Sequence, residues 1–394
     1  MTRRIGVVTT SRADYGGLVW LLREIQADPT LELLLFVTGM HLSPEFGMTV
    51  RTIERDGFPI HARIEILLSS DTPVGAAKSV GTGVLGFADA FHRTRPDVLV
   101  LFGDRMELWA AAIPALLLQI PVAHIHGGET SQGAVDEAVR HSITKIASIH
   151  FPAAAAYRRR IIQLGEDPAR IFAFGAVGLD ALYRTPLLTR TELQGRLALD
   201  LGERVAIVTF HPVTLEPDTA LIHIENLLQA VEQAGIKAVF TKANADAEGR
   251  QINRRIESFC EAAPDRYRLY DNLGQLTYLS CLKHLDLMVG NSSSGLIEAP
   301  SLKMPVVNIG DRQRGRIAPP NVIAVDPSSE GIRAGIARAV SSEFRRSLEG
   351  MKNPYDPFED GKTGYRIAQK LKEVDLSPSM RKKTFHDLDV GGGA

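Results

Sequence analysis

The stretch RIGVVTTSRADYGGLVWLLREI, residues 4–25, indicates the fold class. Its apolar run Ile5–Val8 is typical of a buried strand, and a periodic apolar segment typical of a helix follows from about Gly17. A strand that leads directly into a helix is the repeating unit of parallel α/β sheets. The turn between them carries Arg12 and Asp14 and lacks the G-x-G-x-x-G pattern with which such turns hold dinucleotides. We therefore expect this cation and carboxylate to serve another ligand.

Apolar runs alternate with helical segments in two blocks of the chain, which predicts an α/β protein with two doubly wound domains. Strand signals vanish over residues 183–203, so we expect one domain over 1–185 and a second over 186–362. Residues 377–394 are charged and then Gly-rich, and we expect a poorly ordered tail there. The expected strands are RIGVVTT, LELLLFVTG, IHARIEIL, DVLVLFG and PVAHIHG in the first block, and RVAIVTFHP, IKAVFTK, RYRLYDN, LDLMVGN, PVVNIG and NVIAVD in the second.

The bulk composition excludes several classes of function. Of the 394 residues 44% are hydrophobic and 23% are charged, and the net charge of −1 offers no basic footprint for nucleic acid. No apolar run reaches the roughly 18 residues of a membrane span, and no signal peptide is recognisable. Cys260 and Cys281 form no disulfide framework or metal spacing. We therefore expect a cytoplasmic protein with buried thiols and without a nucleic-acid or membrane partner.

In open α/β sheets ligands bind at the carboxyl ends of the strands, and here those ends are unusually polar. In VGNSSSGLIEAP, Gly290 permits a tight turn, and Ser292 and Ser293 with the following serine open a helix whose free N–H groups suit a phosphate. Glu298 is expected to accept hydrogen bonds from a ribose diol. The simpler alternative is that a serine is an ordinary N-cap and Glu298 an ordinary helix residue.

Two further strand ends in the second block carry donors for an anion. His211 follows a strand directly, and Pro212 after it forces an extended exit. Arg312, in GDRQRGR, adds a cation at another strand end. A lone histidine is more often structural, so His211 is a candidate anion-binding residue only because the serine cluster lies in the same block. No Walker-type G-x-x-x-x-G-K-[ST] is present, so ATP hydrolysis is not expected.

The first block supplies titratable side chains. In FGDRMEL, Asp104 is expected to be an N-cap with Glu107 completing a capping box, which leaves Arg105 to point toward a ligand. In HIHGGE, His124 and His126 lie at strand spacing and are expected to share a face. H-x-H can indicate a metal, but no third ligand is specified, so we expect no metal.

A carboxylate and imidazole cluster follows in DEAVRH. Asp136 and Glu137 open a predicted helix, with Arg140 and His141 one turn later. Asp136 and Arg140 have the spacing of an ordinary helical ion pair, which is the simpler alternative. We favour general acid/base chemistry, because carboxylates and imidazoles lie near arginines in the sequence.

Together these motifs resemble the hydrolysing UDP-N-acetylglucosamine 2-epimerases, especially the bacterial sialic-acid and legionaminic-acid pathway branch. The resemblance runs in family order from residue 5 to about residue 370, and NPYDPFEDGKTGYRI resembles the closing segment of the family. The turn SRADYG favours the hydrolysing branch, since the non-hydrolysing branch tends to read G-T-R-P-E there. The matching motifs are SRADYG, VTGMH, GDRMEL, HIHGGE, DEAVRHSITK, HPVT, GNSSSG and NIGDRQRGR.

The resemblance implies two Rossmann-like domains like those of GT-B glycosyltransferases, an active site in the interdomain cleft, and a final helix over 363–376 that crosses back to the first domain. It implies a nucleotide-sugar substrate, no cofactor, and a homodimer or homotetramer. The nucleotide diphosphate would contact His211, Ser292, Ser293, Glu298 and Arg312. The sugar side would be lined by Arg12, Asp14, Asp104, Arg105, Asp136, Glu137 and Arg140.

Some relatives carry Glu where this chain has His126, so the base at C2 is sought among Asp104, His126, Asp136 and Glu137. The implied reaction is elimination to a 2-acetamidoglycal followed by addition of water. The substrate would be UDP-N-acetylglucosamine, a UDP-linked 2,4-diacetamido sugar or a GDP-linked relative. Two alternatives remain open from the residues: a GT-B glycosyltransferase, which needs an acceptor, and a nucleotide-sugar binding protein without turnover.

Overall fold

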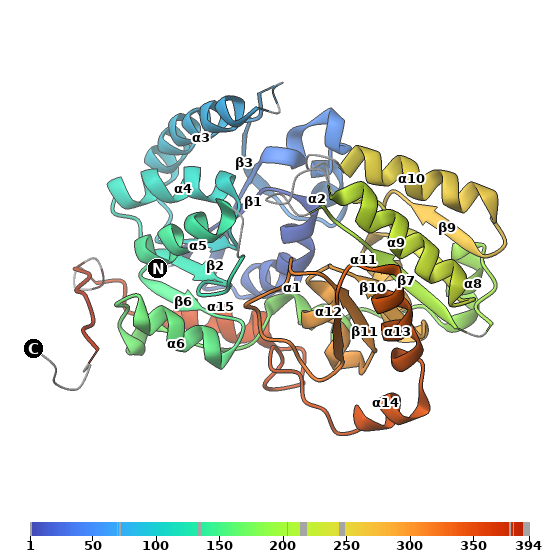
Figure 1. Ribbon diagram of the computed structural model, residues 1–394. Coiled ribbons are helices and arrows are strands. Elements are labelled where there is room, and N and C mark those ends of the chain that lie inside the picture. Colours follow the sequence, from blue (N-terminus) through green and yellow to red (C-terminus); the bar gives the residue numbers. More distant parts are fainter. Residues whose placement is uncertain are drawn as a thin grey trace, which may run out of the picture. The chain divides into compact units, whose positions relative to one another are not determined.

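The computed structural model describes residues 2–68, 70, 72–131, 135–202, 204–212, 219–243, 249–377, 380 and 382–388 (Figure 1). The chain divides into two compact units. The first unit comprises Met1–Glu129, Val135–Ala181 and Tyr355–Ala394. The second comprises Thr130–Ala134 and Leu182–Pro354. In the part of the chain that is described, no helix is both long and apolar enough to cross a membrane.

The first unit contains a six-stranded, wholly parallel sheet in the order β3-β2-β1-β4-β5-β6. Successive strands are added outward from β1 on one side and then outward from β4 on the other. The strand order therefore reverses between β1 and β4, where ligand sites of doubly wound sheets form. The strands are β1 Arg3–Thr9, β2 Leu31–Thr38, β3 Ile60–Ile64, β4 Val98–Phe102, β5 Val122–Ile125 and β6 Ile149–Phe151.

Helices cover both faces of this sheet, which explains why its strands are continuously apolar. Side chains of α1 and α15 share one buried cluster with one face, and side chains of α3, α4 and α5 share another cluster with the opposite face. The helices of this unit are α1 Arg12–Ala27, α2 Val50–Arg55, α3 Pro73–Thr94, α4 Met106–Leu117, α5 Val135–Ile146, α6 Ala155–Gln163, α7 Asp180–Arg184, which continues into the second unit, and α15 Thr363–Glu373, with 3-10 turns η1 Gly39–Leu42, η2 Pro44–Phe46, η3 Pro168–Arg170 and η4 Val177–Leu179.

The helix α15 joins this unit although it lies nearly two hundred residues further along the chain than α7. The carboxylate of Asp180 accepts hydrogen bonds from the backbone N–H groups of Thr363 and Gly364, at 2.9 and 2.7 Å. A side chain on Gly364 would meet the backbone of Leu21 in α1 at 2.9 Å. Asp180 thus caps the helix, and the absence of a side chain at Gly364 lets it lie close against α1.

Several described residues of the C-terminal segment, over which a poorly ordered tail is expected, pack within the first unit, and for the rest of the segment that expectation stays a prediction. Met380 is buried in the core cluster of the first unit. Lys383 donates to the carboxylate of Glu166, 2.6 Å away, and to the carbonyl of Ala147 at 2.7 Å. The composition of the segment does not predict this packing, because Lys383 pairs with Glu166, more than two hundred residues away in sequence. Residues 378, 379, 381 and 389–394 lie outside the described residues.

Glu166 is the centre of a buried charge cluster. Its carboxylate also pairs with Lys145 at 2.9 Å and with His150 of β6 at 3.1 Å. Burial acts to raise the pKa of Glu166, but hydrogen bonds from His150, Lys383 and Lys145 outweigh it and lower the pKa to about 2. The C-terminal segment therefore helps to fix the edge strand of the sheet.

The second unit repeats the arrangement with a parallel sheet in the order β12-β11-β10-β7-β8-β9, and α9, α10 and α13 pack on one of its faces. Here the strand order reverses between β7 and β10. The elements are β7 Val205–Thr209, β8 Lys237–Thr241, β9 Tyr267–Tyr270, β10 Leu287–Gly290, β11 Val306–Ile309, β12 Val322–Val325, α8 Arg190–Leu197, α9 Ala220–Gln233, α10 Gly249–Ala262, α11 Gly274–His284, α12 Ser294–Ile297, α13 Ser329–Ala339, α14 Ser342–Ser347 and the 3-10 turn η5 Ala299–Leu302.

The predicted fold class of two doubly wound parallel α/β domains is confirmed, and each of the eleven expected strands overlaps a strand of the structure. The short strand β6 was not predicted, because three residues leave little periodicity to detect. The helix α1 begins at Arg12 rather than near Gly17, because its polar first turn is stabilised by side-chain hydrogen bonds and not by apolar packing.

We predict that Lys383→Met lowers the free energy of unfolding by about 1–3 kcal/mol, because it removes one cation from a carboxylate buried in the core. Lys382→Met, at the exposed neighbouring position, is the matched control and should change little. Urea denaturation at pH 7 measures both. Glu166 stabilises the fold above its unfolded pKa of about 4.5, so the difference should shrink as the pH falls toward 2. Equal effects of the two substitutions would contradict the proposed docking of the segment.

Candidate active site

The candidate site of the first unit lies where the strand order reverses, at the carboxyl ends of β1 and β4. The turn after β1 carries Arg12 and Asp14, and the turn after β4 carries Asp104 and Arg105. The charge of Asp14 acts on the guanidinium of Arg105, so the two turns face each other. The sheet topology thus brings together residues that are about ninety positions apart.

Asp14 holds the turn after β1 in place. Its carboxylate accepts hydrogen bonds from the hydroxyls of Thr9 and Thr10, both at 2.5 Å, and from the backbone N–H of Ser11 at 3.1 Å. His41, which follows β2, lies 3.9 Å from it. Burial acts to raise the pKa of Asp14, but the hydrogen bonds from His41 and the threonines outweigh it and keep the pKa below its usual value. Asp14 is therefore an ionised carboxylate engaged by its own turn.

Arg12, by contrast, is exposed and has no ion-pair partner among the residues that the structure describes. It is the first residue of α1, where the helix dipole disfavours a cation. A cation kept at that position is consistent with a negatively charged ligand.

The turn after β4 corrects the expected capping box. The N-cap of α4 is Arg105, not Asp104, and Glu107 lies at the second helical position. Glu107 is buried and pairs with Arg105 at 2.8 Å. Asp104 pairs with Arg140, which also donates to the carbonyl of His126 at 2.8 Å. Arg140 therefore ties the ends of β4 and β5 together, instead of pairing with Asp136 along its own helix.

Asp136 is the carboxylate of this site with an environment suited to proton transfer. Burial and the negative charge of Asp104 raise its pKa above the ordinary value, against the opposing charges of Arg105 and Arg140. No ion pair holds it among the described residues. A carboxyl group with a raised pKa is a stronger base than an ordinary carboxylate, which makes Asp136 a candidate for proton transfer.

The two histidines of HIHGGE have different environments. His124 is fully buried, with Nε2 2.8 Å from the carbonyl of Gly103 and Nδ1 3.0 Å from the hydroxyl of Thr144. Burial lowers its pKa to about 3, so it is a neutral structural residue. The strand ends at Ile125, and His126 has a left-handed backbone with φ of +62°, so the alternation that predicted a shared face does not extend to it.

His126 instead forms a pair with Glu129, whose carboxylate lies 2.7 Å from Nδ1. Its Nε2 is buried and has no hydrogen-bond partner among the described residues. The ring also lies edge-on to Phe102, with centroids 4.9 Å apart. A carboxylate on one nitrogen and an unpartnered second nitrogen are features found in a general acid or base.

Glu137 pairs with a residue of its own helix. Its carboxylate pairs with His141 of the same helix at 3.2 Å. Across the described residues, no group of three or more His, Cys, Asp or Glu side chains has a geometry that would hold a metal ion.

The candidate site of the second unit also lies where the strand order reverses, at the ends of β7 and β10. Asn291 uses both ends of its amide on His211, two residues beyond β7: Oδ1 accepts from the N–H of His211, and Nδ2 donates to the carbonyl of His211, each at 2.8 Å. The carbonyl of Asn291 accepts from Arg312 at 3.1 Å and from Gln313 at 2.8 Å. One residue therefore positions both predicted anion donors.

His211 is neutral in this setting. Burial, and next the charge of Arg312, lower its pKa to about 3. It can therefore donate a hydrogen bond to an anion without adding a charge, while Arg312 supplies the cation.

The serine cluster is arranged around a tyrosine that the sequence pattern did not single out. Burial and the charge of Glu298 raise the pKa of Tyr278, in α11, against smaller opposing effects of the Ser292 and Ser294 hydroxyls. The helix after Ser293 has only four residues, Ser294–Ile297, and continues as a 3-10 turn. A helix this short contributes little dipole. An anion bound here would therefore depend mainly on hydrogen bonds from hydroxyl and backbone N–H groups.

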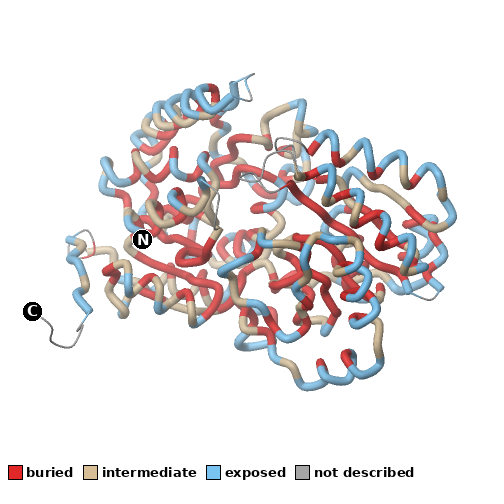
Figure 2. The backbone as a smooth tube through the Cα atoms, in the orientation of Figure 1, coloured by how far each residue is buried: buried red, intermediate tan, exposed pale blue. Residues whose placement is uncertain are grey.

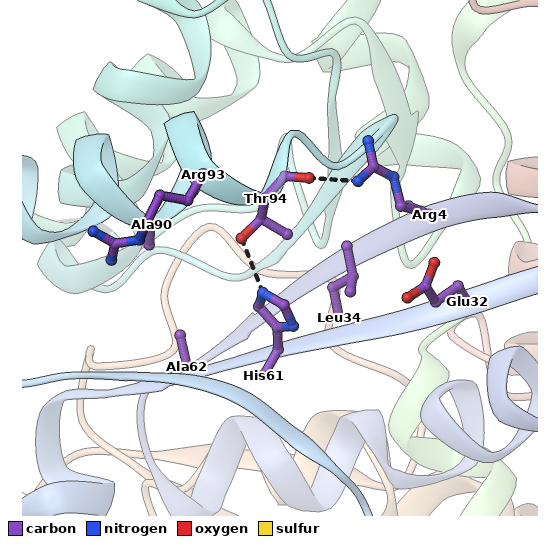
Figure 3. A pocket seen from close by; sticks show the side chains of 8 residues that line it. All are labelled: Arg4, Glu32, Leu34, His61, Ala62, Ala90, Arg93 and Thr94. Carbon is purple, nitrogen blue, oxygen red and sulfur yellow. Dashed lines mark hydrogen bonds between the residues drawn. The ribbon is translucent and has the colours of Figure 1, made fainter.

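Of two cavities, one borders the site of the second unit and the other lies apart from both sites. One of about 380 Å³ adjoins Asn291 and includes Asp311 and Asp326, whose carboxylates do not suit a phosphate. The other, of about 400 Å³, lies at the amino ends of β1–β3, away from the candidate site (Figure 3). Arg4 lines this cavity, and its guanidinium donates hydrogen bonds to the carbonyls of Thr94 and Arg95, both at 2.6 Å.

Sequence reasoning missed several residues that position the site. Most of these residues lie in or beside the quoted motifs, but the contacts that position the site form only in the folded chain. Val213 and Thr214 of the HPVT motif lie outside the described residues. The missed residues are His41, Glu129, Tyr278, Asn291 and Gln313.

The two sheets and their sites define a GT-B-like α/β protein. The profile of the family described as UDP-N-acetylglucosamine 2-epimerase matches residues 23–372. The chain belongs to this family.

Two curated relatives are similar over most of their length. The GDP/UDP-N,N'-diacetylbacillosamine 2-epimerase (hydrolyzing) of Campylobacter jejuni is 38% identical over 88% of this chain and 89% of its own. The UDP-N,N'-diacetylbacillosamine 2-epimerase (hydrolyzing) of Legionella pneumophila is 38% identical over 97% and 99%. The solved structure of UDP-GlcNAc 2-epimerase from Neisseria meningitidis bound to UDP-GlcNAc shares the fold, with a TM-score of 0.80 at 16% identity over 94% and 100% of the chains.

We predict that Gly290→Ala costs about 3–5 kcal/mol of stability. Gly290 has φ of +138°, and a Cβ there would lie 1.9 Å from the carbonyl oxygen of Thr209. Gly235→Ala is the matched control, since φ is +67° with nothing within 4 Å of the added Cβ, and should cost only about 1–2 kcal/mol. Chemical denaturation of both variants provides the comparison, and similar costs would contradict this geometry.

Proposed function

We propose that this protein is a hydrolysing nucleotide-sugar 2-epimerase that releases a free 2-epimerised 2-acetamido sugar and a nucleoside diphosphate. Membership of the 2-epimerase family supports the reaction class. The observation that carries the proposal is Asp136, whose pKa is raised by burial and by Asp104 while two arginines face it. A protein that only binds nucleotide sugars needs no proton-transfer group, and a glycosyltransferase would use one on an acceptor rather than at C2 of the donor sugar.

The C2 proton of the sugar is weakly acidic, so a stable anion formed by direct deprotonation is not expected. Elimination avoids it: a base takes the C2 proton, the C2–H electrons form the C1=C2 double bond, and the C1–O electrons leave with the diphosphate. Water then adds to the 2-acetamidoglycal, with hydroxyl at C1 and a proton at the opposite face of C2. The net reaction consumes one water and needs no oxidant or cofactor.

Within the candidate pool, Asp136 and His126 are proposed as the groups that exchange protons. Asp104 and Glu137 are engaged by Arg140 and His141 in the resting site. Asp136 would be the base at C2, since burial and Asp104 raise its pKa and make the carboxylate more basic than usual. His126, oriented by Glu129 and with Nε2 unpartnered among the described residues, would return a proton.

The leaving diphosphate carries the charge that develops as the C1–O bond breaks. Arg12 and Arg105 from the first unit, and His211, Ser292, Ser293 and Arg312 from the second, are proposed to stabilise it. Glu298 would accept hydrogen bonds from the ribose. Asp14 would act indirectly by fixing the turn that carries Arg12.

The substrate is proposed to be a UDP- or GDP-linked sugar of the 2,4-diacetamido type, with UDP-N-acetylglucosamine as the alternative. Relatives named for diacetylbacillosamine are 38% identical, whereas one from Neisseria meningitidis named for UDP-N-acetylglucosamine is 30% identical. Incubating the protein with each nucleotide sugar alone tests the assignment. Free nucleotide with an epimerised sugar is expected for one of them. Turnover only with an added acceptor would favour a glycosyltransferase, and binding without turnover a binding protein.

The acidic limb of the pH–activity profile should lie above the ordinary carboxyl pKa, because Asp136 must be ionised to act as base and its pKa is raised. Asp104→Asn removes a neighbouring negative charge and releases Arg140, so the limb should shift to lower pH even though activity falls. The profile of kcat/KM measures this. A limb that stays in place would remove Asp136 from the role of base.

In heavy water the released sugar should carry deuterium at C2, because the new C2 hydrogen comes from solvent. Asp136→Asn should lower kcat by roughly 100-fold or more, because the elimination loses its base, whereas Glu137→Gln is the adjacent control and should retain most activity. Mass spectrometry and proton NMR of the product give both readouts. A product that retains its original C2 hydrogen would favour simple hydrolysis of the glycosyl phosphate instead.

A further inference from the structure

The turn over residues 126–129 is packed between two helices. A side chain on Gly127 would lie 2.9 Å from the hydroxyl oxygen of Thr144 in α5. A side chain on Gly128, which has φ of +75°, would lie 2.7 Å from the carbonyl oxygen of Tyr157 in α6. Glycine at both positions therefore lets the turn lie close against both helices.

The helix α6 has one buried side and one exposed side (Figure 2). Its C-terminal end is held by contacts of its own. Lys145 of α5 donates to the carbonyl of Leu164 at 3.1 Å, and the backbone N–H of His386 donates to the carbonyl of Gly165 at 2.9 Å. The helix is therefore a fixed support for the turn that packs against it.

Arg160 of α6 forms a hydrogen bond with this turn. Its guanidinium donates to the carbonyl of Gly128 at 2.6 Å and lies over the ring of Tyr157, 5.7 Å from the ring centroid. A hydrogen bond from a guanidinium is stronger than one between neutral groups, and the ring helps to hold the guanidinium in place. Gly128 directly precedes Glu129, whose carboxylate is 2.7 Å from Nδ1 of His126.

We propose that Arg160 is a positioning residue for the second step of the reaction. By holding Gly128, it fixes Glu129 and, through that carboxylate, the ring of His126. This inference rests on the proposed function, in which His126 returns the proton to C2 of the glycal.

The backbone of His126 has supports that do not involve Arg160. Its N–H donates to the carbonyl of Phe151 at 3.0 Å, and its carbonyl accepts from Arg140 at 2.8 Å. Loss of Arg160 should therefore leave this backbone in place and free the carboxylate of Glu129, which orients the ring.

The two steps of the proposed reaction depend on different groups, so they can be impaired separately. Elimination needs Asp136 as base, whereas the addition of water needs a proton at C2. A chain that eliminates but returns the proton slowly lets the glycal leave before water adds. Each nucleoside diphosphate released is then matched by one glycal, which keeps the C1=C2 double bond and consumes no water, instead of by one epimerised sugar.

The share of glycal in the released sugar, measured by proton NMR on the full chain, tests this inference. Arg160→Met should raise that share roughly tenfold or more, because proton transfer depends steeply on the placement of the donor. Arg159→Met, at the exposed neighbouring position of α6, is the matched control and should leave the share unchanged. Arg160→Lys retains a cationic donor and should restore most of the epimerised product.

The share compares two products of the same active molecules, so a partly unfolded preparation does not change it. Circular dichroism checks the fold, and if Arg160→Met does not fold, Arg160→Gln should raise the share in its place. Equal shares for the substitutions at Arg160 and Arg159, a lower rate with an unchanged share, or no rescue by lysine would overturn the role of Arg160 and leave the proposed function intact. A wild-type chain that releases no nucleoside diphosphate from any nucleotide sugar would overturn the proposed function and this inference together.

Discussion

The reversal of strand order in each parallel sheet is the constraint on which both sites depend. Where two neighbouring strands send their connections to opposite sides, their carboxyl ends are left uncovered by the helices that follow. In the first unit this occurs between β1 and β4, beside Arg12 and Asp104. In the second it occurs between β7 and β10, beside His211 and Asn291. The catalytic and anion-binding candidates are thus set by topology before any side chain is chosen.

The exposed ends are then stiffened by polar side chains that bond to the backbone. Asp14 accepts from the turn after β1, Arg140 joins the ends of β4 and β5, and Asn291 holds His211 just beyond β7. The charges and amides of these three residues are paired within the protein. The turns are therefore stable without help from candidate ligand-binding groups such as Arg12, which has no ion-pair partner among the described residues.

Much of this arrangement follows from local pattern, and the remainder does not. The apolar runs predict the strands and the parallel sheets because burial on both faces demands continuous hydrophobicity. The polar strand ends indicate where to look, as with Ser292 and His211. Pattern fails where the partner is distant: Arg140 has the spacing to pair with Asp136 but finds Asp104, and Lys383 finds Glu166. Such choices depend on which strands are neighbours, which a local window cannot encode.

The first unit is completed by a segment that begins at Tyr355, after the second unit, and this order has a consequence for biosynthesis. The helix α15 lies against α1, and the N-terminus of α15 is capped by Asp180, yet α15 and Lys383 are made only after the whole second unit. On the ribosome the second unit can be complete while the first still lacks the helix that packs against α1. The apolar side chains of α1 that α15 covers therefore stay exposed until the last forty residues of the chain are made.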